Sequence, residues 1–261
     1  MVYFKHHIAR PNNFFKYIIH LKIFMDAFIQ FWSVDNTLFT LFGYPMSYLE
    51  FFGTLFNLAC VWLIARHNIW NWPIGIIGVI FFSALFYQIR LYSDLIEQVY
   101  YLLTGFYGWW VWLYAGKPND KNEKTVLKIT HSSPTHNLIY AGAIVIGTAL
   151  LGWFMARIHI FFPTVFPEAA SFPYLDAFTT VVSFAATILI IYKKIECWHL
   201  WILVDIIGVG LYFAKGVVFV SLLYFLFFII ATKGLITWRR IYNKEKTYDH
   251  RTGNRKILPA A

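Results

Sequence analysis

The sequence predicts an all-α integral membrane protein with seven transmembrane helices in a 3+1+3 arrangement, preceded by an amphipathic helix. Hydrophobic residues make up 59% of the 261 residues and charged residues only 13%, whereas soluble domains carry about 45–50% apolar and about 25% charged residues. Seven apolar segments have the length of about 20 residues that a bilayer span requires. These segments also recur as a three-helix unit, so we expect two parallel repeats joined by a connector helix.

The N-terminal extension, residues 1–45, is expected to contain the amphipathic helix. Its apolar stretch from Phe14 to Trp32 is interrupted by polar residues that fall within an arc of about 160° on a helix. These residues are Lys16, His20, Lys22, Asp26 and Gln30. Such a helix lies at the membrane interface or packs on the bundle. A targeting segment is the weaker alternative.

The seven spans are predicted near residues 46–66, 72–91, 94–114, 137–160, 173–192, 198–214 and 217–238. They divide the rest of the chain into a first three-helix repeat (46–114), a cytoplasmic loop (115–136), a connector helix (137–160), a second three-helix repeat (173–238) and a basic cytoplasmic tail (239–261). An odd unit followed by an odd connector places the two repeats parallel in the membrane.

A shift of 126 residues aligns the two predicted repeats without a gap. It places Trp72 on Trp198, and it also matches Gly108 with Gly234 and Trp112 with Trp238. Matched tryptophans and glycines are more informative than matched aliphatic residues in so apolar a chain. Because substrate sites of repeat-built transporters lie near the midplane where the repeats meet, we expect the site there.

Basic residues predict the orientation of the chain. Lys and Arg are most frequent in the 115–136 loop, in the tail, and at Arg66, Lys193 and Lys194. The positive-inside rule makes that side cytoplasmic, with the C-terminus inside and the N-terminus outside. The net charge of +9 is interpreted as orientation signals and contact with anionic lipid, and not as a nucleic-acid site. No disulfide is expected between the two cysteines.

Polar residues inside the predicted spans indicate a binding cavity, because they are costly in hydrocarbon and normally face the bundle interior. Trp198, Trp201 and Asp205 are spaced i, i+3, i+7 and share one helix face. Two indoles can flank a flat ring and attract a cation. A structural hydrogen-bond role for Asp205 is the alternative. In the third span, Gln98 and Tyr101 are the better cavity candidates.

Two other positions, Asn57 and Trp72, are candidates with an equally plain structural explanation. Asn57 belongs to a polar stripe with Glu50, Gly53 and Thr54, for which helix packing is an equal alternative. Trp72 is the counterpart of Trp198 and either lines the site or anchors the helix at the interface. Asp94, at the start of the third span, is interpreted as a helix cap.

Signals for other functional classes are missing from the sequence. It has no Walker-type glycine-rich loop, no Cys/His cluster with metal-ligand spacing and no G-x-S-x-G nucleophile motif. We therefore expect no ATP motor, no metal, no cofactor and no enzymatic activity.

Two composite motifs resemble the PnuC-type nicotinamide riboside transporters, over residues 46–240. The first is Asn71-Trp72-Pro73-Ile74-Gly75-Ile76-Ile77-Gly78, followed by Phe86-Tyr87-Gln88, Leu91-Tyr92-Ser93-Asp94 and Gln98. The second is Trp198-x-x-Trp201-x-x-x-Asp205, followed by Leu211-Tyr212-x-x-Lys215-Gly216 and Leu223-Tyr224.

This resemblance implies a fold related to the SWEET sugar transporters, a homotrimer, and a place in the bacterial inner membrane. It implies uptake of nicotinamide riboside by facilitated diffusion, with a cytoplasmic kinase that phosphorylates and traps the substrate. Trp198, Trp201 and Asp205 would fall on a tryptophan-rich binding motif and Gln98 on the polar face of the third helix. Asn57 and Tyr212 are carried over by position alone.

Alternatives to this function stay open from the sequence. Thiamine is also an aromatic cation and suits much of the same chemistry, and related transporters of other vitamins are similar. An ion-coupled carrier that uses Asp205 as the coupling group is a second alternative. A membrane receptor or scaffold that transports nothing is the third, and the lack of a large soluble domain counts against it.

Overall fold

The computed structural model describes residues 13–41, 43–89, 92–115, 127–164, 166, 168–214 and 218–255. Its elements are α1 (Asn13–Phe31), β1 (Thr37–Leu41), β2 (Tyr44–Ser47), α2 (Tyr48–Ala65), α3 (Asn71–Gln88), α4 (Tyr92–Tyr114), α5 (Pro134–Phe161), α6 (Pro173–Ile191), α7 (Cys197–Ala214) and α8 (Val218–Arg255). Among the described residues, six helices are long and apolar enough to cross a membrane: α2, α3, α5, α6, α7 and α8.

The third predicted span corresponds to α4, which is not one of those six helices. Its 23 residues give it sufficient length, but its acidic, amide and tyrosine side chains make it less apolar than the others. All seven predicted spans coincide with helices, and their ends agree within a few residues except at the C-terminus. There α8 continues for 38 residues, or about 57 Å at 1.5 Å per residue, so most of the predicted polar tail prolongs the last helix.

The prediction of an all-α chain was wrong for the segment before α2, which forms a two-stranded antiparallel hairpin. Thr37 pairs with Ser47 and Leu41 with Tyr44, and Gly43 turns the chain at φ 82°, a conformation that glycine adopts without strain. The hydroxyl of Tyr44 donates to Glu50 of α2 at 2.8 Å. Partial burial and this carboxylate raise the pKa of Tyr44 to about 12.

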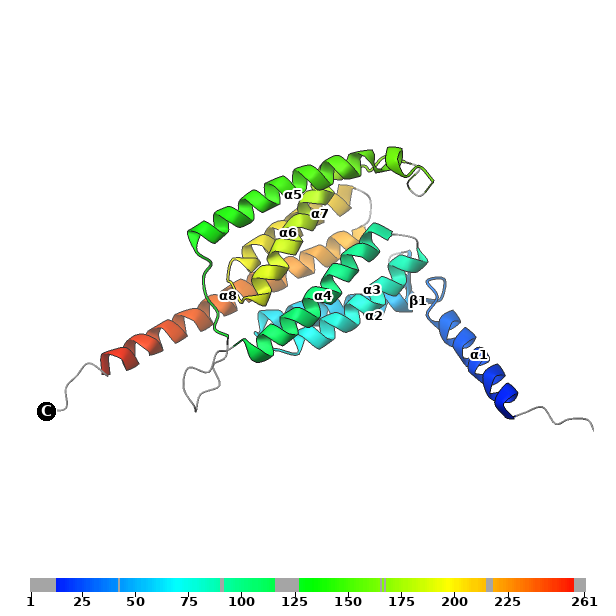
Figure 1. The fold of residues 1–261 in the computed structure, drawn as a ribbon, viewed down its shortest axis with the longest axis horizontal. Helices are drawn as coiled ribbons and strands as arrows, with labels where there is room; N and C mark the ends of the chain where they lie inside the picture. Colours follow the sequence, from blue (N-terminus) through cyan, green and yellow to red (C-terminus); the bar gives the residue numbers. More distant parts are fainter. Residues whose placement is uncertain are drawn as a thin grey trace, which may run out of the picture.

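Six helices close a ring. α2 packs on α3 and α8, α3 on α4, α4 on α6, α6 on α7, and α7 on α8. α5 lies outside this ring against α6 (Figure 1). α1 projects from one end of the bundle and the C-terminal part of α8 from the other (Figure 1). At the end of α1, Phe31 packs on Tyr48 of α2, and Trp32, which follows the helix, packs on Phe52 and Phe81.

Two tryptophans that are 126 residues apart fill equivalent holes. A Cβ atom on Gly108 of α4 would overlap the ring of Trp72 of α3. In the other half, a Cβ atom on Gly234 of α8 would overlap the ring of Trp198 of α7. Each indole therefore packs directly against the backbone of a neighbouring helix at a glycine. The two halves have the same packing contact.

Reciprocal hydrogen bonds join the two halves at one end of the ring. The indole nitrogen of Trp112 donates to the backbone oxygens of Ile190 and Ile191, at 3.4 and 3.1 Å. The indole nitrogen of Trp238 donates to the backbone oxygen of Ile64 at 3.0 Å. Trp112 and Trp238 are 126 residues apart, as are Ile64 and Ile190, so each half binds the other through the same pair of positions.

The turns before α3 and α7 complete this closed end. His67 and Lys193, again 126 residues apart, adopt left-handed backbone angles of φ 56° and 51°. The ammonium of Lys193 lies 4.3 Å from the centre of the Trp112 ring, and the His67 ring lies 5.9 Å from that of Trp238. Burial lowers the pKa of Lys193 to about 8. Burial and the charge of Lys193 lower the pKa of His67 to about 4.

The segment just before α5, the last part of the predicted loop, is tied to the α6–α7 turn. The backbone N–H of Thr130 donates to Lys193 and the N–H of Ile195 donates to Thr130, both at 3.1 Å. The backbone N–H of Ser132 donates to the Glu196 carboxylate at 2.9 Å. This part of the loop is therefore an ordered component of the closed end.

The indole-on-glycine packing generates a stability prediction. Gly234→Ala should lower the free energy of unfolding by about 1–3 kcal/mol, because the added methyl group occupies the space of the Trp198 ring. Gly210→Ala on α7 is the control, since a Cβ there meets nothing within 4 Å. Thermal unfolding of both variants in detergent measures the difference, and equal melting temperatures would contradict the prediction.

Candidate functional site

The three predicted site residues on α7 have different surroundings. Trp198 is 1% exposed and is enclosed by α8, where its ring meets Trp238 edge-on at 5.5 Å. Trp201 is half-buried between two apolar clusters, and no described residue accepts a hydrogen bond from its indole nitrogen. Asp205 is only 3% exposed. One helix face thus carries a packing indole at one end and a buried carboxylate at the other.

Asp205 faces α8. Its charge acts on Tyr224 of α8, whose ring occupies the position that a Cβ on Gly208 of α7 would take. Tyr212 of α7 stacks on Tyr224, with ring centres 5.3 Å apart and an angle of 16°. Among the described residues, none forms a hydrogen bond or an ion pair with Asp205. Nothing in the described part of the chain supports the alternative of a structural hydrogen-bond role for this carboxylate.

Side chains from α4 and α6 complete the group around Tyr224. The carboxylate of Glu97 accepts a hydrogen bond from the Thr180 hydroxyl at 2.7 Å, and Tyr101 contacts the side chain of Ser183. Glu97 and Tyr101 both interact electrostatically with Tyr224. We call this set the interior polar cluster; its members are Glu97, Tyr101, Thr180, Ser183, Asp205 and Tyr224.

The remaining predicted site residues lie around this cluster or in the packing between helices. Gln98 is 9% exposed, and no described residue hydrogen-bonds its amide. The amide of Asn57 donates to the backbone oxygen of Gly53 at 3.2 Å and lies against Gly78 of α3, which agrees with the helix-packing alternative. Trp72 is buried over α4, so its surroundings are those of a packing residue and not of an interfacial anchor.

Sequence reasoning missed four members of the interior polar cluster: Glu97, Thr180, Ser183 and Tyr224. Glu97 precedes Tyr101 by one helical turn, and that spacing was a usable signal for a shared face. Tyr224 stands in one of the family motifs. Nothing in the sequence indicated Thr180 and Ser183, because their relevance comes from the packing of α6 on α4.

The interior polar cluster breaks the correspondence between the two halves. Shifting Asp205 back by 126 residues leads to Val79, and shifting Glu97 forward leads to Leu223. Both counterparts are aliphatic, so the acidic groups occur on only one side of the ring. A ligand bound there would meet a polar surface from α4, α6, α7 and Tyr224 of α8, and a more apolar one from α2 and α3.

The two seams between the halves also differ. Along the α4–α6 seam, Tyr100 donates to the backbone of Phe184 at 2.9 Å and the Tyr107 hydroxyl bonds that of Tyr192 at 2.8 Å, in addition to the bonds of Glu97 and Trp112. Among the described residues, the equivalent α2–α8 seam has only the hydrogen bond from Trp238. The first seam is hydrogen-bonded along its length and the second is mainly apolar.

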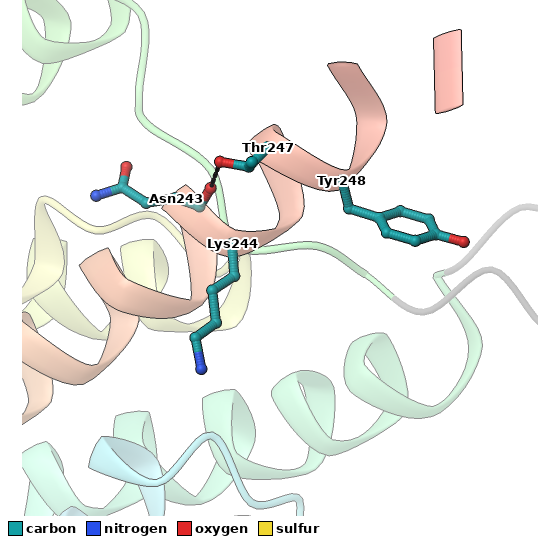
Figure 2. A pocket seen from close by; sticks show the side chains of 4 residues that line it. All are labelled: Asn243, Lys244, Thr247 and Tyr248. Carbon is teal, nitrogen blue, oxygen red and sulfur yellow. Dashed lines mark hydrogen bonds between the residues drawn. The ribbon is translucent and has the colours of Figure 1, made fainter. Parts of the chain in front are cut away.

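A separate hollow of about 390 Å³ lies near the C-terminal end of α8. It is lined by Asn243, Lys244, Thr247 and Tyr248, and Figure 2 shows these side chains spread around one helix. The only bond drawn between them runs from the Thr247 hydroxyl to the backbone of Asn243, at 2.8 Å. Because one helix supplies all four residues, this hollow is a surface feature outside the ring.

No group of three or more metal-ligating side chains occurs among the described residues. The interior polar cluster consists of carboxylates, hydroxyls and phenols beside an indole. Groups of these types are able to bind and orient a small organic molecule, particularly one that carries positive charge and hydroxyls.

Residues 47–240 match the nicotinamide mononucleotide transporter family. The chain belongs to this family. It is 30% identical to the nicotinamide riboside transporter PnuC of Escherichia coli over 80% of this chain and 94% of that protein. It is 24% identical to the riboflavin/roseoflavin transporter RibM of Streptomyces davaonensis over 78% of this chain and 91% of that protein.

A solved structure, the crystal structure of the vitamin B3 transporter PnuC, has the same fold. It aligns with a TM-score of 0.56 and 22% identity over 76% of this chain and 83% of that one. The resemblance predicted from the motifs is therefore confirmed. So is the prediction that the chain is no enzyme, because the nicotinamide mononucleotide transporter family is one of multi-pass membrane transporters.

The buried carboxylate generates a prediction that separates stability from binding. Asp205→Asn should raise the thermal stability of the ligand-free protein, because a buried carboxylate without a partner is costly and an amide is less so. An increase of about 1 kcal/mol is expected, while substrate binding should weaken. Melting curves at pH 8 measure the change, with exposed Asp35→Asn as the control; destabilisation by Asp205→Asn alone would contradict it.

Proposed function

We propose that this chain carries nicotinamide riboside across the membrane through the interior of the helix ring, by facilitated diffusion. The observation that carries the proposal is Asp205, buried at 3% exposure beside the half-buried Trp201 and without a partner among the described residues. The names of the relatives support the substrate: the E. coli protein is a nicotinamide riboside transporter.

The chemistry of nicotinamide riboside suits the interior polar cluster. Its pyridinium ring is a flat cation, which an indole face attracts by about 0.5–2 kcal/mol and a carboxylate attracts by charge. Its ribose and carboxamide offer hydroxyl and amide groups for Gln98 and Tyr101. The cluster has no Lys or Arg among the described residues, which favours the riboside over the phosphorylated mononucleotide.

Thiamine is not favoured by the comparisons, whose named relatives are transporters of nicotinamide riboside or riboflavin. Among the predicted site residues, we keep Trp201, Asp205, Gln98, Tyr101 and Tyr212 in the proposed site. Trp72 and Trp198 are assigned to the packing that supports it, and Asn57 to the contact between α2 and α3.

We propose that α4 is the seventh transmembrane helix and that the spans form a 3+1+3 arrangement, with α5 as the connector. The equivalent contacts at positions 126 residues apart support this, because α2, α3 and α4 correspond to α6, α7 and α8. The domain boundaries expected from the sequence follow from the same division, with the second repeat prolonged by the helical tail.

The proposed orientation places the closed end of the ring and the C-terminus in the cytoplasm of a bacterium, and the N-terminus outside its inner membrane. Lys193 and Lys194 at the closed end, and Arg239 and Arg240 on α8, support this assignment. α1 would lie in the membrane interface, since its apolar side chains are exposed in the single chain.

A homotrimer and a cytoplasmic kinase complete the proposal, and both rest on the resemblance. A passive carrier only equalises the concentration of its substrate on the two sides. Net uptake therefore requires a reaction inside the cell that removes the substrate, and phosphorylation does so because the product carries an anionic phosphate.

Proteoliposomes that contain only the purified chain test the transport proposal. Labelled nicotinamide riboside should enter until the inside and outside concentrations are equal, and unlabelled substrate inside should accelerate this exchange. Accumulation beyond equality under an imposed proton or sodium gradient would replace facilitated diffusion with the ion-coupled carrier. Absence of exchange would leave the receptor alternative.

A pair of tryptophans tests the position of the site. Trp201→Ala should weaken nicotinamide riboside binding at least tenfold, because the indole supplies a face for the pyridinium ring. Trp110→Ala on α4 should leave binding unchanged, since Trp110 is 57% exposed on the outside of the bundle. Isothermal calorimetry of the two purified variants gives the comparison; equal losses would place the site elsewhere.

A further inference from the structure

A second carboxylate lies in the interior polar cluster, at a position outside the tryptophan motif. Glu97 comes from α4, on the side of the ring opposite to α8, and its charge acts on Tyr101, Tyr212 and Tyr224. These tyrosines belong to α4, α7 and α8. The carboxylate of Glu97 also accepts the hydrogen bond from Thr180 of α6 at 2.7 Å, so it lies against the neighbouring helix of the ring and not toward lipid.

The hydrogen bond that holds Glu97 to α6 does not compensate the negative charge of the carboxylate. The bond from Thr180 is a neutral hydroxyl donor at 2.7 Å. No Lys, Arg or His among the described residues forms an ion pair with Glu97 or with Asp205. The chain has a net charge of +9, yet the described interior between α4, α7 and α8 holds two carboxylates and no countercharge.

Further acidic groups lie at the end of the helix ring where α4 and α6 begin. Tyr212 also interacts with the charges of Asp94 and Asp176, which stand in the first turns of α4 and α6. A positively charged solute that enters from this end therefore meets acidic side chains before it reaches Glu97 and Asp205. Buried Asp205 provides the independent sign of a ligand, since no described residue satisfies it.

We propose that Glu97 determines charge selectivity in this transporter: together with Asp205 it forms a two-carboxylate counter-ion that selects a cationic ring over a neutral ring of the same size. The inference rests on the proposed function and adds a specificity-determining residue to it. Asp205 acts from α7 beside Trp201 and Glu97 acts from α4, with α6 between the two helices, so both negative groups face the bound ring from the polar side of the helix ring.

The physical reason is the cost of burying charge in a medium that cannot solvate it. A ligand of charge +1 is attracted by both carboxylates and compensates one of their two negative charges when it displaces water from the helix ring. A neutral ligand of the same shape makes the same aromatic contacts but leaves both carboxylates without a countercharge. Selectivity therefore arises as much from rejection of the neutral ring as from attraction of the cation.

A purely structural role for Glu97 is the competing explanation, because its bond to Thr180 belongs to the α4–α6 seam. The two roles depend on different properties of the side chain. A seam contact depends on the hydrogen bond, which a glutamine also accepts. Charge selectivity depends on the negative charge, which a glutamine lacks and an aspartate retains.

The test compares two ligands that differ in charge. Nicotinamide riboside carries a positive pyridinium ring, and its reduced 1,4-dihydro form has a neutral ring of nearly the same size. Affinities of the purified full-length chain for both compounds are measured by calorimetry in detergent at pH 8. The wild-type chain should bind the cation at least tenfold more tightly than the neutral form.

Glu97→Gln should lower the ratio of the two affinities at least fivefold, by weakening the binding of the cation and strengthening the binding of the neutral form. Glu97→Asp should retain most of the ratio. Thr180→Ala removes the seam bond and keeps the charge, so it should change melting temperature more than the ratio. Glu50→Gln is the matched control, because Glu50 also accepts a hydroxyl hydrogen bond, from Tyr44 of the hairpin at 2.8 Å.

Each outcome separates the inference from the function on which it rests. If the wild-type chain binds neither compound, the proposed function fails and the inference fails with it. If the wild-type chain binds both compounds equally well, or if Glu97→Gln keeps the wild-type ratio, the inference alone is overturned. A ratio lost equally in Glu50→Gln would also overturn it, because the effect would then not belong to this site.

Discussion

Every polar group inside the ring must be satisfied by another part of the protein or by a ligand, because the surrounding hydrocarbon offers neither hydrogen bonds nor countercharge. This constraint explains the distribution of side chains. Most of the interior is aliphatic or aromatic, and the indole nitrogens of Trp112 and Trp238 donate to backbone oxygens of the opposite half. Among the described residues, Asp205 and the indole nitrogen of Trp201 have no such partner, and neither do the tightly packed indole nitrogens of Trp72 and Trp198.

The same constraint separates what the sequence predicted from what it did not. Hydropathy located the helices, since a span must be apolar along its whole length, and the prediction weakened only where α4 exchanges aliphatic residues for tyrosines and acids. The hairpin before α2 was missed because two strands of five and four residues give too short an alternation to stand out among apolar neighbours. The helical extension of α8 was missed because a charged sequence was interpreted only as a tail.

The candidate site was predictable where it depends on one helix. Helical spacing brought Trp201 and Asp205 together, and the structure keeps them on one side of α7. The same spacing included Trp198, but a neighbouring glycine on α8 draws that indole into the packing. Thr180 and Ser183 could not have been chosen, because their proximity to Glu97 and Tyr101 results from how α6 packs on α4 and leaves no local pattern.

The unequal seams constrain how the ring can change shape. α4 and α6 belong to different halves and are fastened by several hydrogen bonds, whereas α2 and α8 meet mostly through apolar side chains. A movement that preserves the hydrogen bonds between α4 and α6 must rotate the two halves about that seam as a hinge. The contact that would open is the one between α2 and α8. The hydrogen bond from Trp238 to the backbone oxygen of Ile64 would have to break during this rotation.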